Sequence, residues 1–167
     1  MSEAHVVDTN VLCVAEDKSD DWPTECGLEC IRFLAELRKG GRLVLDDAQR
    51  ILREYGKALD AVGNGQPGVG RLFLHWAYRN WANEERCEIV PLTPLPRDPS
   101  DFEEFPKDPA LADFHTDDRK FVAVARASER NPDVVEATDS DWWDAREALL
   151  NNGVRVRFLC PEVFEAS

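Results

Sequence analysis

Residues 5–16 read HVVDTNVLCVAE, a short apolar run that ends at Asp8 and passes at once into a segment suited to a helix. The same change of pattern recurs along the chain, where apolar residues at helical spacing separate the strand-like runs. The further runs are RLVLD (42–46), CEIVPL (87–92), DVVEATD (133–139) and VRVRFLC (154–160). Strands that alternate with helices favour right-handed crossovers and a mainly parallel sheet covered on both faces. The sequence therefore predicts an α/β fold with three layers, α/β/α, around a five-stranded sheet.

The chain has 167 residues, a length at which we expect a single domain over residues 1–167. One segment departs from the alternating pattern, an acidic insert at about residues 93–113 that carries five prolines. We expect this insert to lack regular secondary structure, and loops of that length are usually functional or mobile.

The five cysteines show no zinc-binding pattern, because the only close pair, Cys26 and Cys30, has no second pair or histidine beside it. We therefore expect buried or free thiols and a reducing, cytoplasmic location. The N-terminus lacks the basic and apolar regions of a signal peptide, and no apolar run approaches the roughly 20 residues of a membrane span. A soluble protein without a membrane partner is expected.

Acidic residues stand where the predicted strands end. Asp8 closes the first strand, Asp139 and Asp141 follow the fourth in ATDSDW, and Asp117 and Asp118 open the helix after the insert. Because the carboxyl ends of parallel strands meet at one edge of the sheet, where ligands bind in such folds, these side chains are expected to converge. A further acid, Glu54, lies on the helix after the second strand, among apolar positions.

Crowded carboxylates repel one another unless cations neutralise them, and Mg²⁺ or Mn²⁺ prefers oxygen ligands. One or two such ions activate water for phosphodiester hydrolysis, so no histidine base is needed. Each acid also has a purely structural interpretation. Asp8 suits a helix cap, Asp118 a first-turn acid, Asp139 a turn residue and Glu54 a solvated helical acid.

Four segments together resemble the PIN-domain nucleases over residues 6 to about 160. VVDTNVL, ILREYGKAL, DDRKFVAVA and ATDSDWW occur in the order and approximate spacing of that family. The resemblance implies a metal-dependent ribonuclease, as in many toxins of bacterial toxin–antitoxin pairs. It matches the family's acidic quartet to Asp8, Glu54, Asp118 and Asp139, the auxiliary acid to Asp141, and polar neighbours to Thr9, Asn10 and Thr138.

The doubled acid leaves a choice between Asp117 and Asp118 for the third member of the quartet. We favour Asp118, because Phe121, Val122 and Ala125 then follow at spacings that direct the apolar face of the helix inward.

The charge of the chain, −13 with a pI of about 4.6, argues at first against a nucleic-acid ligand. The charge is unevenly distributed, however: residues 32–86 carry ten basic and seven acidic residues, whereas residues 98–118 carry eight acids and one lysine. Five cations close to the proposed metal ligands are candidates for phosphate contacts, and a solvated helix face is the alternative explanation. They are Arg50, Arg53, Lys57, Arg119 and Lys120.

These features favour a Mg²⁺- or Mn²⁺-dependent endoribonuclease. Its expected partners are an RNA substrate, a protein antitoxin and a second copy of the chain in a homodimer. A catalytically silent PIN-like module that binds RNA or protein is the alternative from another class. A receiver-type phosphoacceptor domain fits less well, because it requires a lysine at the end of its last strand, where this chain has only Arg155 and Arg157.

Overall fold

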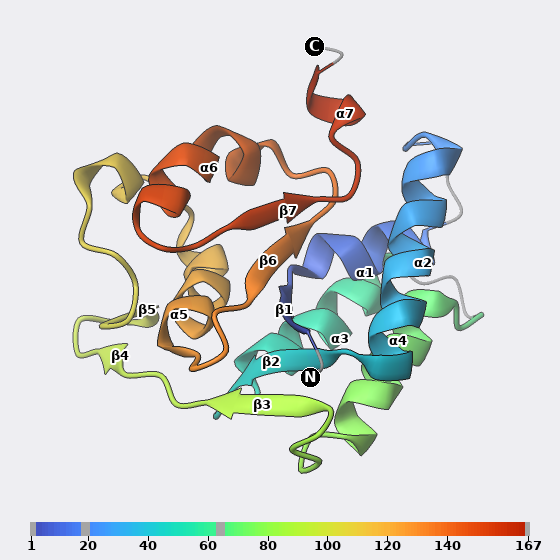
Figure 1. Ribbon diagram of the computed structural model, residues 1–167, viewed down its shortest axis with the longest axis horizontal. Coiled ribbons are helices and arrows are strands. Elements are labelled where there is room, and N and C mark those ends of the chain that lie inside the picture. Colours follow the sequence, from blue (N-terminus) through green and yellow to red (C-terminus); the bar gives the residue numbers. More distant parts are fainter. Residues whose placement is uncertain (1–2, 18–20, 63–65, 166–167) are drawn as a thin grey trace.

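The protein was analysed as a computed structural model that describes residues 3–17, 21–62 and 66–165. Its centre is a parallel sheet with the strand order β3-β2-β1-β6-β7 (Figure 1). The strands are β1 (Ala4–Val7), β2 (Arg42–Asp46), β3 (Cys87–Val90), β6 (Asp133–Glu136) and β7 (Val156–Phe158). The prediction of a five-stranded, parallel α/β sheet is confirmed.

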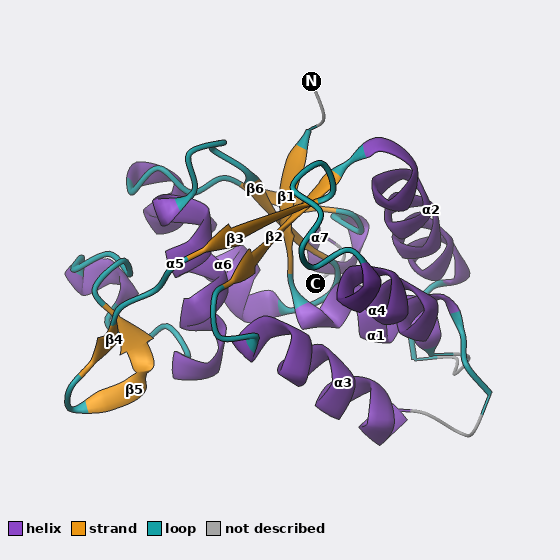
Figure 2. Cartoon of the chain, turned by 90° about the horizontal axis from the view of Figure 1, so that it is seen from below, coloured by secondary structure: helices purple, strands orange, loops and turns teal. Residues whose placement is uncertain are grey.

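Helices cover both faces of this sheet, as Figure 2 shows. The helices α1 to α4 pack against one another, whereas α5 packs against β1, β2 and β6, and α6 packs against β7. Their bounds are α1 (Thr9–Glu16), α2 (Thr24–Gly40), α3 (Arg50–Val62), α4 (Val69–Arg79), α5 (Arg119–Ala127), α6 (Ser140–Asn151) and α7 (Glu162–Glu165). The arrangement is the predicted three-layer α/β/α fold. Among the described residues, no helix has the length and apolar character needed to cross a membrane.

Acidic residues at strand ends also start the helices that follow. Asp8 caps α1, and Asp139 caps α6. Asp46, the last residue of β2, is fully buried and accepts hydrogen bonds from the backbone N–H groups of Ala48, Arg50 and Ile51 at the start of α3. Such side chains satisfy backbone donors that have no partner within the helix. The ends of β1 and β2, and the segment after β6, are thereby fixed to the helices that follow them.

The apolar face of α5 is directed inward. Phe121, Val122 and Ala125 are buried against the sheet, which confirms the orientation expected for a helix that has Asp118 at its start. Asp118 itself is the last residue of a short 3₁₀ turn, η2 (Thr116–Asp118), that leads into the helix. The packing of α5 on the sheet therefore fixes the place of Asp118.

The insert at residues 93–113 is structured, so the expectation of an irregular segment is wrong. It forms an antiparallel pair, β4 (Pro94–Leu95) and β5 (Asp98–Phe102), followed by a 3₁₀ turn, η1 (Pro109–Leu111). Phe105 of the insert stacks on Phe114, with ring centroids 5.9 Å apart, and Phe114 meets Trp142 of α6 at 5.0 Å. Burial of aromatic side chains thus orders a segment in which helical and strand periodicity are both weak.

A disulfide joins Cys26 of α2 to Cys160 after β7, with 5.4 Å between the two Cα atoms. The expectation of free thiols is therefore wrong for these two residues, whereas Cys13, Cys30 and Cys87 are free. The partners lie 134 positions apart, and the fold alone brings them together. Sequence spacing carries no signal for such a pair.

Candidate active site at the carboxyl ends of β1 and β6

The sheet reverses its direction of growth at β1. The chain passes from β1 to β2 and β3 on one side, and later crosses to β6 and β7 on the other. In open parallel sheets, ligands bind at this switch point, beyond the carboxyl ends of the two adjacent strands. Asp8 directly follows β1, Glu136 is the last residue of β6, and Asp139 lies three residues later. The topology therefore brings acids to the position where a ligand site is expected.

Asp8 lies at the centre of this group and is only 3% exposed. Its backbone N–H donates to the carbonyl of Val135 in β6 at 3.0 Å, and its Oδ2 accepts from the N–H of Asn10 at 3.3 Å. Its Oδ1 is buried and has no conventional donor among the described residues. One carboxylate oxygen thus caps α1, while the other is left for a proton or a cation.

Glu136 is the acid that the sequence interpretation missed. It is fully buried, and its Oε1 accepts from the N–H groups of Ala137 at 2.9 Å and Asp139 at 3.3 Å. Its Oε2 lacks a conventional donor in the described chain. Burial raises the pKa of Glu136 and that of Asp8, and the two carboxyls hydrogen-bond when a proton lies between them. The sequence signal that could have assigned Glu136 to the site is its position as the last residue of an otherwise apolar strand.

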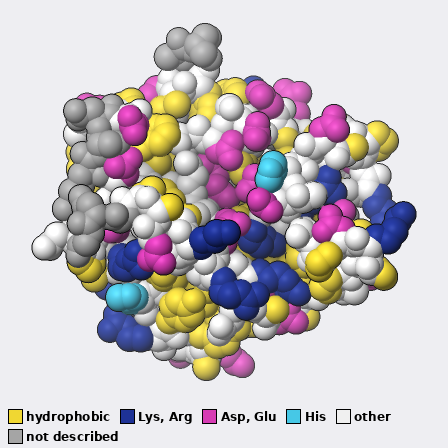
Figure 3. Space-filling model, turned by 180° about the vertical axis from the view of Figure 1, so that it is seen from behind, with side chains coloured by type: hydrophobic (Ala, Val, Ile, Leu, Met, Phe, Trp, Pro, Cys, Tyr) yellow, Lys and Arg dark blue, Asp and Glu magenta, His cyan; other side chains and the backbone are white. Residues whose placement is uncertain are grey.

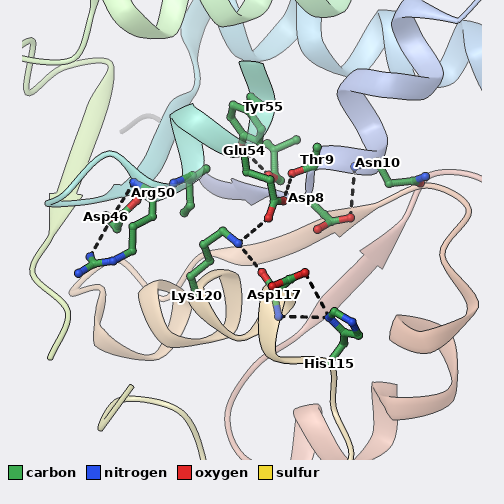
Figure 4. A network of polar contacts seen from close by, with 12 residues as sticks. Asp8, Thr9, Asn10, Asp46, Arg50, Glu54, Tyr55, His115, Asp117 and Lys120 are labelled. Carbon is green, nitrogen blue, oxygen red and sulfur yellow. Dashed lines mark hydrogen bonds and ion pairs between the residues drawn. The ribbon is translucent and has the colours of Figure 1, made fainter. Parts of the chain in front are cut away.

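Glu54 reaches the same site from α3 (Figure 4). Its two carboxylate oxygens accept from the hydroxyl of Thr9 and from Nζ of Lys120, the latter at 2.5 Å. The next residue, Tyr55, donates from its phenol to the carbonyl of Val7 at 2.5 Å and so attaches α3 to the end of β1. These contacts hold Glu54 over the residues that follow β1.

The two acids before α5 differ in their surroundings. The side chain of Asp117 is 72% exposed, and its backbone N–H donates to Nδ1 of His115 at 3.2 Å. Asp118 is half-buried, and its pKa is raised to about 8, first by burial and then by the negative charges of the other three acids of the quartet. Asp118 is therefore the acid of this pair that interacts with the buried group.

Asp139 completes the group from the start of α6. Burial is the main cause of its raised pKa, which the charge of Asp141 increases further. Its Oδ1 accepts from the backbone N–H of Asp141 at 2.9 Å. The side chain of Asp141 is exposed, so this acid lies at the rim of the site.

Asn10 and Thr138, two of the polar residues predicted to lie beside the acidic quartet, connect the segments that follow β1 and β6. The Oδ1 atom of Asn10 accepts from the backbone N–H of Thr138 at 2.7 Å and from its hydroxyl at 3.0 Å. Since Asn10 lies next to Thr9 and Thr138 next to Asp139, this contact fixes two parts of the acidic group relative to each other.

The possible metal ligands at this site are carboxylate oxygens, which suit a hard divalent cation. Two of these oxygens are buried and accept no conventional hydrogen bond in the described chain. The oxygens are not as close together as the ligands of one ion. Among the described residues, the only set of three or more His, Cys, Asp or Glu ligand atoms within 4.8 Å of one another is the sulfur group of Cys26, Cys30 and Cys160. The acidic side chains thus fit a cation in chemistry, and would have to move inward to surround one.

The five predicted phosphate-binding cations divide into two kinds. Arg53 and Lys57 are exposed on α3. The other three are held by acids: Lys120 by Glu54, Arg50 by Asp46 at 3.1 Å, and Arg119 by Asp101 of the insert at 3.0 Å. On one face of the molecule, Lys and Arg side chains gather directly beside a hollow surrounded by acids (Figure 3).

Arg119 has a structural role that the sequence did not suggest. Besides its ion pair with Asp101, it donates to the carbonyls of Ala112 at 2.9 Å and Phe114 at 3.0 Å, and its guanidinium lies over the ring of Phe105 at 4.4 Å. Its side chain is only 13% exposed. Arg119 therefore fastens the insert to the start of α5 and is poorly placed for an RNA phosphate.

In comparisons with known proteins, no family model, no curated protein and no solved structure matches this chain. The resemblance to PIN-domain nucleases consequently stays a prediction, which rests on the order of the acidic segments.

Proposed function

We propose that this protein is a metal-dependent nuclease of the PIN type that hydrolyses phosphodiester bonds in RNA. The observation that carries the proposal is the convergence of Asp8, Glu54, Asp118 and Asp139 from four separate parts of the chain. Three of these acids have raised pKa values, with burial as the first cause. Buried negative charge is unfavourable without a positive partner, which supports a cationic ligand at this position.

The residues that would hold Mg²⁺ or Mn²⁺, as one or two ions, are the quartet, with Asp141 contributing from the rim and Glu136 from behind Asp8. Such an ion, when bound, lowers the pKa of a water molecule and stabilises the charge that develops on the phosphate. The donor set supports this choice of metal, since carboxylate oxygens suit hard cations and thiolates suit softer ones.

The surrounding residues would keep these carboxylates in place. Thr9 and Lys120 fix the orientation of Glu54 through its two oxygens. Asn10 and Thr138 hold together the two segments that carry Asp8 and Asp139. Groups positioned before the reaction need little reorganisation during it, which is a main source of electrostatic catalysis.

We also propose the biological setting that the resemblance implies, a toxin held by a protein antitoxin in the cytoplasm, with a homodimer as a further assembly. One observation opposes the location: the Cys26–Cys160 disulfide, since a reducing cytosol disfavours such bonds. The alternative function is a silent PIN-like module that binds RNA or protein. It is favoured by the spread of the carboxylates, which lie further apart than the ligands of a preformed metal site.

The test is incubation of the purified protein with single-stranded RNA and DNA in Mn²⁺, Mg²⁺ or EDTA, beside Asp8→Asn. We expect RNA cleavage that requires metal and is abolished by the substitution. RNA binding without cleavage, equal in both proteins, would favour the silent module. Cleavage that survives in Asp8→Asn would show that the proposed site is not responsible.

A further inference from the structure

A small pocket of about 260 Å³ lies beside the acidic group. Arg50 and Arg53 of α3 and Lys120 of α5 contribute three positive charges to its lining, against one negative charge from Asp117. Ser100 and Thr116 add hydroxyl groups. The lining residues are thus rich in hydrogen-bond donors and carry more positive than negative charge, although Asp46 and Asp47 pair with Arg50 and Glu54 pairs with Lys120.

The insert builds one wall of this pocket. Pro99, Ser100 and Phe102 of β5 line it together with the two arginines of α3. The insert is fixed to α5 by the ion pair between Arg119 and Asp101. The pocket is therefore a feature of this chain's own Pro-rich insert, and the α/β core alone does not form it.

Arg50, one of the two arginines that line the pocket, is held in place before any ligand binds. The guanidinium of Arg50 pairs with Asp46 at 3.1 Å and lies over the ring of Phe102, 5.2 Å from its centroid. A guanidinium has five N–H donors in a planar fork, and the ion pairs with Asp46 and with Asp47, at 3.6 Å, both involve Nη1, which leaves the donors of Nε and Nη2 for a planar or tetrahedral oxyanion. Arg53 is exposed, and within the described residues no ion pair holds it. It can therefore turn toward a ligand.

Lys120 connects the pocket to the proposed active site. Lys120 lines the pocket, and its ammonium donates to Glu54 of the acidic quartet at 2.5 Å. An anion in the pocket would therefore lie next to the carboxylates that the nuclease proposal assigns to the metal. A group on the same nucleic-acid strand as the bond to be cut could therefore reach the pocket.

We propose that this pocket binds a phosphate group of the nucleic acid, adjacent to the phosphate that is cleaved. The inference rests on the proposed nuclease function and names the group by which the substrate is held. Arginine with a hydroxyl partner suits phosphate oxygens, and the volume is below the roughly 300–1,000 Å³ of usual small-molecule sites. The phosphate is either a terminal monoester or an internal diester of the strand.

The first measurement uses inorganic phosphate as the probe and the full chain in EDTA, so that neither metal nor cleavage is involved. Phosphate should shift the backbone amide resonances of residues 100–102 and 116–120 in protein NMR spectra. Arg53→Gln should weaken phosphate binding about tenfold, the size expected for one charge-assisted hydrogen bond. The matched control is Arg79→Gln, which removes an exposed arginine of α4 outside the pocket and should leave the binding unchanged. Equal losses in the two variants, or shifts elsewhere only, would overturn the proposal.

The second measurement distinguishes the two sources of phosphate with RNA oligonucleotides that carry either a 5′-phosphate or a 5′-hydroxyl. Ca²⁺ replaces the catalytic metal in this binding assay. If Arg53→Gln loses affinity only for the strand with a 5′-phosphate, the pocket binds a terminal phosphate monoester. If it loses affinity equally for both strands, the pocket binds an internal phosphodiester. No loss for either would contradict the pocket's role.

Cleavage assays on the same proteins separate the two proposals. If phosphate binding depends on Arg53 but the protein does not cleave RNA, the proposal for the pocket would stand and the proposal of nuclease activity would be rejected. If the protein cleaves RNA with metal but Arg53→Gln does not change phosphate binding, only the proposal for the pocket would be rejected.

Discussion

The carboxyl of Glu136, at the end of β6, is the buried neighbour of the carboxyl of Asp8, which follows the adjacent strand β1. Each has one oxygen without a conventional donor in the described chain, and burial raises the pKa of both. Two carboxyls in this position keep a proton between them unless a cation replaces it. The pair thus links proton release to cation binding at the proposed active site.

Replacing Glu136 with glutamine tests this link. Glu136→Gln removes one buried acid and supplies an amide donor to Asp8, so the melting temperature in EDTA should rise by about 2–4 °C, which corresponds to roughly 1 kcal/mol at this chain length. The rise caused by added Mn²⁺ should shrink. Glu147→Gln, which alters an exposed acid of α6, should change neither value. An unchanged response to Mn²⁺ in Glu136→Gln would separate this residue from the metal site.

The stability of the metal-free protein should fall as the pH rises. The pKa of Asp118 is raised to about 8 in the folded protein from an ordinary value of 3.8, so the folded state binds more protons between these values. The free energy of unfolding then decreases with increasing pH in that interval. Urea unfolding in EDTA at pH 5, 6.5 and 8 measures this slope, and Asp118→Asn should flatten it. Mn²⁺ should stabilise the protein most at pH 8, and a slope of the opposite sign would contradict the buried acidic site.

Asp46 should contribute more to stability than its neighbour Asp47. Asp46→Ala removes the cap of α3 and leaves Arg50 without its buried partner, at an expected cost of about 2–4 kcal/mol. Asp47→Ala should cost less than about 1 kcal/mol, because the side chain of Asp47 is exposed and its contacts with Arg50, at 3.6 Å, and with the N–H of Leu92, at 3.3 Å, are long. Chemical denaturation of both variants measures the difference. Equal costs would show that α3, and with it Glu54, is held by other contacts.

The Cys26–Cys160 disulfide should stabilise the protein strongly. It closes a loop of 134 residues, for which the chain-entropy model gives an upper value of about 5 kcal/mol. Reductant should therefore lower the denaturation midpoint of the natural chain and leave that of a Cys26→Ala, Cys160→Ala double variant unchanged. Insensitivity of the natural chain to reductant would mean that both thiols are free, in agreement with a reducing cytosol.

The sequence was sufficient for the sheet and for much of the candidate site, because both follow from local patterns. An apolar run that ends in an acid identified β1 and Asp8, and the acids that follow the apolar run of β6 in ATDSDW identified Asp139. The choice of Asp118 over Asp117 followed from the apolar positions of α5. In each case the information lies within about ten residues of the side chain concerned, as helical and strand periodicity require.

The features that escaped prediction depend on contacts between distant segments. Glu136 belongs to the site because β6 lies beside β1, and its place at the end of the apolar run DVVE was a local signal that the sequence interpretation did not use. The disulfide and the role of Arg119 in holding the insert likewise arise from tertiary packing. Phe105 and Phe114 order the insert through each other and Trp142, so its prolines were a poor guide to its structure.

The most direct test compares two adjacent substitutions, Asp118→Asn and Asp117→Asn, in Mn²⁺-dependent cleavage of single-stranded RNA. Both replace a carboxyl by an amide in the same turn, but only Asp118 interacts with the buried acids, whereas Asp117 is exposed. We predict that Asp118→Asn lowers the cleavage rate at least about 100-fold, as expected for loss of a group that holds or orients a catalytic metal, and that Asp117→Asn retains most of it. Equal activity of the two variants, whether both are active or both inactive, would contradict the assignment of Asp118 to a metal-dependent active site.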